Sequence, residues 1–84
     1  MTLNEKFEDA QRRVKGLATA PDTATLLELY ALYKQGTAGD IAGSRPGMFD
    51  LKGRAKYDAW AGRKGSSRDA AMEAYVALVD RLTA

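Results

Sequence analysis

One segment of the chain, residues 30–64, reads YALYKQGTAGDIAGSRPGMFDLKGRAKYDAWAGRK. It begins in a predicted helix that places Tyr30, Tyr33 and Lys34 at positions i, i+3 and i+4, which share one surface patch. A glycine-rich loop interrupted by Pro46 follows, and the segment ends in a second predicted helix. Two tyrosines and several amines beside a loop indicate a site for an anionic ligand that also carries a flat ring.

The composition limits the chemistry that the chain can perform. With 84 residues it has room for one domain, which we expect to span residues 1–84. Neither cysteine nor histidine is present, so there is no thiolate nucleophile, no zinc site of the usual kind and no imidazole base. The glycine-rich loop matches neither of the common phosphate-binding fingerprints. We therefore predict a protein that is not an enzyme and that holds no metal ion and no cofactor.

The charges are unevenly distributed. A net charge of +2 is too small to indicate a nucleic-acid-binding protein by itself. From Lys52 to Arg68, however, there are six bases and a single acid, Asp58, which favours partners with concentrated negative charge. No apolar run opens the chain or is long enough to cross a bilayer. We expect a cytoplasmic monomer without stable membrane insertion.

The apolar residues recur at helical spacing, and no segment alternates with the period of a strand, so an all-α fold is predicted. The first helix is expected over residues 2–16, where Thr2 and Glu5 match a capping box. Pro21 prevents that helix from continuing. The second helix is expected to be capped by Asp22 or Thr23 and to run to about Gly36 or Ala38.

The loop at residues 37–49 is long for a helix-to-helix connection. We expect it to carry the chain along the length of the molecule, so that the helices before and after it run parallel. The third helix is predicted from its cap Asp50 to about Lys64. The fourth is predicted to begin at Ser66, with Asp69 completing a pair similar to a capping box.

Each residue of the candidate site has an ordinary explanation when it is taken alone. Tyrosines on an amphipathic helix are usually core aromatics with exposed hydroxyls, and lysines on an exposed face need no ligand. Taken together, the hydroxyls and amines are suitable donors to phosphate, a tyrosine ring can stack on a base, and Leu26 and Leu27 can line a wall for a hydrocarbon. A ligand with a phosphate, a base and an alkyl chain is a lipid carried on a nucleotide.

The same residues resemble the acyl-CoA-binding protein family. The resemblance is strongest in three blocks, YALYKQGTAGD (residues 30–40), RPGMFDLKGRAKYDAW (residues 45–60) and KGSSRDAAMEAYVALV (residues 64–79). It implies a four-helix bundle with up-down-down-up order. It also implies a non-catalytic protein that binds medium- to long-chain fatty acyl-CoA thioesters and carries or buffers them inside the cell.

The resemblance further implies which residues bind the ligand. Tyr30, Lys34 and Lys56 match the positions that hold the 3′-phosphate of the ribose. Tyr33 matches the position that faces the adenine, and Tyr75 the one that reaches the head group from the last helix. The remaining matched positions are Lys15 and Lys52 near the head group and Leu26 and Leu27 beside the acyl chain.

One departure from the family is next to the phosphate-binding position. Tyr57 stands where the family commonly has a tryptophan, directly after Lys56. The chain contains one tryptophan, so we expect its tryptophan fluorescence to come from Trp60 alone.

Two other functions stay open on the residues alone. A small basic helical module would use residues 52–68 and the tyrosines to bind single-stranded nucleic acid or a protein partner, with a steep salt dependence for nucleic acid. A purely structural bundle would keep its tyrosines in the core and bind no small molecule. Because the resemblance spans three helices and the loop between them, it favours fatty acyl-CoA, and not nucleic acid, as the ligand.

Overall fold

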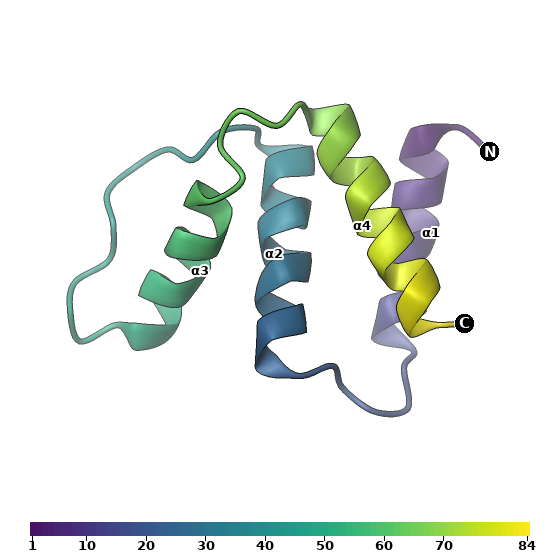
Figure 1. The fold of residues 1–84 in the computed structure, drawn as a ribbon, viewed down its shortest axis with the longest axis horizontal. Coiled ribbons are helices and arrows are strands. Elements are labelled where there is room, and N and C mark those ends of the chain that lie inside the picture. The colour runs from purple at the N-terminus through teal and green to yellow at the C-terminus, as the bar shows by residue number, and fades with distance from the viewer.

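The computed structural model describes residues 1–84 as four α-helices without a strand, which confirms the predicted all-α class. The helices are α1 (Leu3–Lys15), α2 (Thr23–Thr37), α3 (Leu51–Ala61) and α4 (Arg68–Leu82). Figure 1 shows α2 and α3 running in one direction and α1 and α4 in the other, which is the up-down-down-up order implied by the resemblance. The long loop before α3 returns the chain to the lower end of the molecule, as expected from its length.

The helices begin at side chains that accept hydrogen bonds from unpaired backbone N–H groups. Thr2 and Glu5 form the predicted capping box, in which each side chain accepts from the backbone N–H of the other. This bonding lowers the pKa of the Glu5 carboxyl. Asp50 caps α3 as predicted, and of the two candidate caps of α2, Asp22 and Thr23, the structure uses Asp22.

Two helix ends differ from the prediction, on either side of Gly65. Helix α3 ends at Ala61 instead of about Lys64, because from Arg63 on the N–H groups bond to carbonyls three residues back rather than four. Gly65 then adopts a φ of 94°, which reverses the chain in the left-handed region that glycine tolerates best. The cap of α4 is Ser67 and not Ser66, so the fourth helix begins one residue later than predicted.

The hydrophobic core lies between α1, α2 and α4. Helix α4 packs against both α1 and α2, while α3 packs against α2 alone and has no buried residue. The ring of Phe7 meets the ring of Tyr75 edge-on, with centroids 5.0 Å apart. The core residues are Phe7, Ala10, Leu29, Leu32, Met72, Tyr75, Leu78 and Val79.

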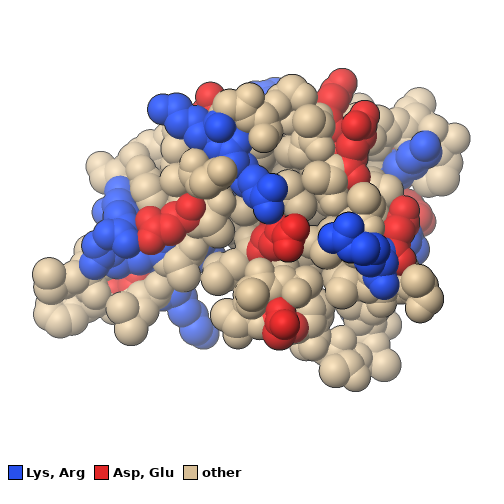
Figure 2. Space-filling view, viewed as in Figure 1, with Lys and Arg blue, Asp and Glu red and all other residues tan.

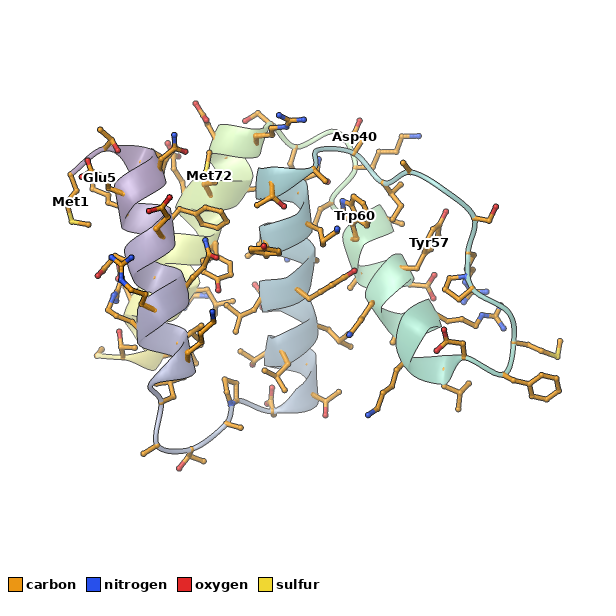
Figure 3. The ribbon with its side chains drawn as sticks, turned by 180° about the vertical axis from the view of Figure 1, so that it is seen from behind. Met1, Glu5, Asp40, Tyr57, Trp60 and Met72 are labelled. Atoms are coloured by element: carbon orange, nitrogen blue, oxygen red, sulfur yellow. The ribbon has the colours of Figure 1, made fainter.

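A buried amide ties the loops to α2 at the upper end of the molecule. Gln35 is completely buried, and its Nε2 donates to the Asp40 carboxylate and to the Ser66 carbonyl, each at 2.8 Å. The Gly65 N–H also donates to Asp40, and this bond, followed by the one from Gln35, lowers the pKa of that carboxyl. The indole N–H of Trp60 donates to the Gly39 carbonyl at 2.8 Å, and Figure 3 shows Asp40 and Trp60 at this end.

We predict that Gln35→Leu lowers the free energy of unfolding by about 2–3 kcal/mol, because the change removes two hydrogen bonds, one of them to a charged carboxylate. Urea unfolding followed by circular dichroism measures the loss. Gln11→Leu is the matched control, since its amide is only half-buried and donates within its own helix, to the Phe7 carbonyl. An equal loss in the two variants would contradict the role assigned to Gln35.

Candidate functional site

An apolar groove of about 640 Å³ opens beside the first half of α2. Helices α1 and α2 are both held by α4 and share no close backbone contact, and the groove occupies the space between them. Nine of its eleven lining residues are hydrophobic, which suits an apolar ligand. The lining combines the end of α1 and the connection to α2 (Val14, Lys15, Leu17, Ala18, Ala20, Pro21) with residues of α2 and α4 (Leu26, Leu29, Tyr30, Tyr33, Tyr75).

A second hollow of about 410 Å³ lies between α2 and α3, and we call it the basic hollow. Lys52 and Lys56 come to it from α3, one turn apart, and Leu27 comes from α2. Leu26 and Tyr30 line both the apolar groove and the basic hollow. The two hollows therefore adjoin along one side of α2, so a ligand with an apolar and an anionic part can contact both.

The lysines of this region have no carboxylate partner. All five ion pairs of the structure use an arginine, such as Arg63 of the α3–α4 connection with Glu28 of α2. The ammonium of Lys56 instead lies 5.4 Å from the centre of the Tyr30 ring, and that of Lys34 lies 4.8 Å from the Trp60 ring. These positive charges are thus available to an anionic ligand.

Three side chains from three helices meet at a small recess beside the apolar groove. Lys15, Tyr33 and Tyr75 come from α1, α2 and α4 and line a space of about 260 Å³. Tyr33 is 39% exposed, so part of its side chain can contact a ligand. Tyr75 is buried, which raises the pKa of its hydroxyl, with the nearby Tyr33 adding to the shift. At neutral pH the Tyr75 hydroxyl is therefore a hydrogen-bond donor.

The structure brings most of the predicted site residues together. Eight of the nine line the apolar groove or the basic hollow: Lys15, Leu26, Leu27, Tyr30, Tyr33, Lys52, Lys56 and Tyr75. Lys34 lines neither, because its half-buried side chain lies over Trp60.

Sequence reasoning missed the wall that the α1–α2 connection supplies. Pro21 was predicted only as a helix stop and Leu17 was given no role in the site, yet both line the apolar groove. The signal was present in the composition of residues 17–21, which contain one polar side chain, Thr19. An exposed connection with so few polar residues indicates an apolar surface.

Tyr57 occupies the position where a tryptophan was expected from the resemblance. Its hydroxyl donates to the Gly43 carbonyl at 3.2 Å, so it joins α3 to the long loop rather than to the basic hollow. Figure 3 shows Tyr57 on the loop side of α3. No cluster of potential metal ligands occurs in the structure, and none of its helices combines the length and apolar character needed to span a bilayer.

Comparison with known proteins identifies the family. The sequence model of the family described as Acyl CoA binding protein matches residues 4–79. Acyl-CoA-binding protein homolog 1 of Caenorhabditis elegans is 56% identical over 84 residues, which cover 100% of this chain and 95% of that protein. The acyl-CoA-binding protein of Saccharomyces cerevisiae is 48% identical over 82 residues, covering 98% of this chain and 94% of that protein.

Solved structures agree with the sequence comparison. The crystal structure of Oryza sativa acyl-CoA-binding protein 2 superposes with a TM-score of 0.92 at 41% identity, covering 96% of this chain and 90% of that one. The solution structure of the yeast acyl coenzyme A binding protein gives a TM-score of 0.72 at 50% identity, covering 90% and 88%. The motif blocks thus led to the right family: the chain belongs to the acyl-CoA-binding protein family, whose members are non-catalytic carriers of acyl-CoA.

Proposed function

We propose that this protein binds medium- to long-chain fatty acyl-CoA and carries or buffers it as a monomer in the cytoplasm. The observation that supports this most strongly is that lysines without a carboxylate partner lie beside tyrosines and an adjoining apolar groove. The thioester presents the same combination of a phosphorylated nucleotide and an alkyl chain. Because the site contains no cysteine, histidine or metal cluster, we assign it binding and no reaction.

The 3′-phosphate is assigned to Lys56, Tyr30 and Lys34. The first two are already neighbours, since the Lys56 ammonium lies over the Tyr30 ring. Lys34 is one turn along α2 from Tyr30 and therefore on the same face. Its long side chain would leave the Trp60 ring and turn toward the phosphate when the ligand binds. Charge-assisted hydrogen bonds to phosphate are stronger than a cation–π contact at a partly exposed site.

The rest of the head group is assigned to the recess and the basic hollow. The adenine would lie against the exposed ring of Tyr33, and the Tyr75 hydroxyl would donate to the head group from α4. Lys15 and Lys52 would add positive charge at the two ends of the site. These side chains suit a ligand that has both a flat base and several phosphate oxygens.

The acyl chain is assigned to the apolar surface around Leu26 and Leu27. Burying roughly 12 methylenes at ~0.8 kcal/mol each would contribute about 10 kcal/mol before costs. Ordering the ligand and the side chains offsets a large part of that gain. The head-group contacts must therefore supply the difference, and they would distinguish the thioester from a free fatty acid.

We predict that Lys56→Ala weakens palmitoyl-CoA binding by at least about tenfold, because it removes a charge-assisted contact to phosphate. Isothermal titration calorimetry measures the affinity. Lys6→Ala, which removes an exposed lysine of α1 outside both hollows, is the matched control and should bind like the wild type. Equal affinity of the two variants for palmitoyl-CoA would contradict the assignment of the 3′-phosphate to Lys56.

We also predict that palmitoyl-CoA changes the emission of Trp60, because Lys34 would move from the indole ring to the phosphate. Trp60 is the only tryptophan, so fluorescence titration reports on this ring alone. Lys34→Met should lose most of the change, whereas Lys52→Met should keep it. A Lys34→Met variant with the full wild-type response would show that Lys34 does not move between these partners.

A further inference from the structure

The small recess beside the apolar groove has a wall that the proposed contacts leave unused. Five residues line this recess, and three of them, Lys15, Tyr33 and Tyr75, are already assigned to the ligand. The other two, Gln11 and Val14, come from α1. Gln11 carries the only side-chain amide of the five, with a carbonyl oxygen that accepts hydrogen bonds and an NH2 group that donates them. What this amide can contact therefore bears on which ligand the recess accepts.

The amide of Gln11 is available to a ligand. Its Nε2 donates to the Phe7 carbonyl at 3.3 Å, which is longer than the typical length of about 2.9–3.0 Å. Inside a helix that carbonyl pairs with the backbone N–H four residues on, so it does not depend on the side chain. The Oε1 atom accepts no hydrogen bond from the protein and reaches solvent, because the side chain is only half-buried. A ligand can thus pair with both polar atoms at little cost.

Gln11 lies between two hollows that share the ring of Tyr33. Both residues line the recess, and both also line a larger hollow of about 480 Å³, which we call the polar hollow. The polar hollow extends from the recess to the end of α2 and the beginning of α4. Only three of its ten lining residues are hydrophobic. A base that lies against Tyr33 therefore shares its space with the Gln11 amide, where apolar surroundings give way to polar ones.

Net charge does not explain recognition at this end of the site. Figure 2 shows basic side chains grouped over α3 and the loop before it, whereas acids and bases are mixed over α4. The polar hollow is mixed in the same way, since Glu8 and Asp69 line it together with Arg68. A neutral heterocycle suits such surroundings better than a phosphate does. A heterocycle is recognised by the donors and acceptors on its edge, which is a task for an amide.

We propose that Gln11 recognises the base of the ligand by pairing its amide with an edge of adenine, which rests on the acyl-CoA binding proposed above. Adenine has its N6 amino donor next to a ring-nitrogen acceptor, N1 on one edge and N7 on the other, and a glutamine amide forms two parallel hydrogen bonds with such an edge. Lysine only donates, valine does neither, and each tyrosine has one hydroxyl. Among the residues of the recess, Gln11 alone offers an acceptor and a donor side by side.

Calorimetry with two thioesters tests the pairing. One is palmitoyl-CoA, and the other is its 1,N6-ethenoadenine analogue, in which a two-carbon bridge removes the N6 donor and blocks N1. The wild type should bind the analogue about tenfold more weakly, because the paired hydrogen bonds are lost. Gln11→Leu should bind palmitoyl-CoA about tenfold more weakly than the wild type does and should no longer distinguish the two thioesters.

Asn4→Leu is the matched control, because it removes an amide of α1 that lines the polar hollow but not the recess. It should bind both thioesters as the wild type does. A circular dichroism spectrum checks that Gln11→Leu is folded, and the comparison of the two thioesters on the wild type does not depend on this variant.

The proposal is overturned if the wild type binds the two thioesters equally tightly. It is also overturned if Gln11→Leu still discriminates between them as the wild type does, since the bridge would then act through its bulk. Equal binding of both thioesters leaves the proposed carrier function intact and removes only the role of Gln11. A wild type that binds neither thioester contradicts the carrier function itself, and the role of Gln11 with it.

Discussion

The buried amide of Gln35 is the contact on which the arrangement of the site depends. It holds Asp40 of the long loop and Ser66 of the α3–α4 connection, and thereby fixes both ends of the chain around α3 to α2. Helix α3 has no buried residue, packs on α2 alone and contributes no side chain to the hydrophobic core. Hydrogen bonds from α2 and the loop therefore fix the position of the helix that carries Lys52 and Lys56.

Arginines and lysines have different roles in this structure, and the difference follows from the chemistry of their side chains. Arginine forms the five ion pairs, including the bidentate pair of Arg45 with Asp58, because its planar guanidinium group matches the geometry of a carboxylate. Arg13 similarly joins α1 to Asp80 of α4 at 2.9 Å. The lysines beside the hollows keep their charge unpaired. The fold is thus held by one kind of base, and the other kind is available to bind a ligand.

Much of the fold could be predicted from the sequence because its signals are local. The capping box of Thr2 and Glu5 and the caps at Asp22 and Asp50 depend on residues within one turn. The start of α4 could not be predicted as reliably, because two adjacent serines compete for the cap and the turn at Gly65 decides between them. Within the candidate site, Tyr30, Tyr33, Lys34 and the wall of Leu26 and Leu27 were predicted from the residues themselves. Lys15 and Tyr75 came only from the resemblance. The contact of Lys34 with Trp60 depends on how distant segments pack, which no local pattern encodes. The wall formed by Leu17 and Pro21, in contrast, left a local signal in the scarcity of polar residues at 17–21.

The central claim is that a basic head-group site and an apolar groove act together on one ligand. Calorimetric titration of the wild-type protein with palmitoyl-CoA, beside an identical titration with free palmitate, tests it most directly. We predict tight one-to-one binding of the thioester and weak or undetectable binding of palmitate, since palmitate has no nucleotide for the lysines and tyrosines to hold. Equal affinity for both ligands, or no heat with palmitoyl-CoA from folded helical protein, would contradict the account.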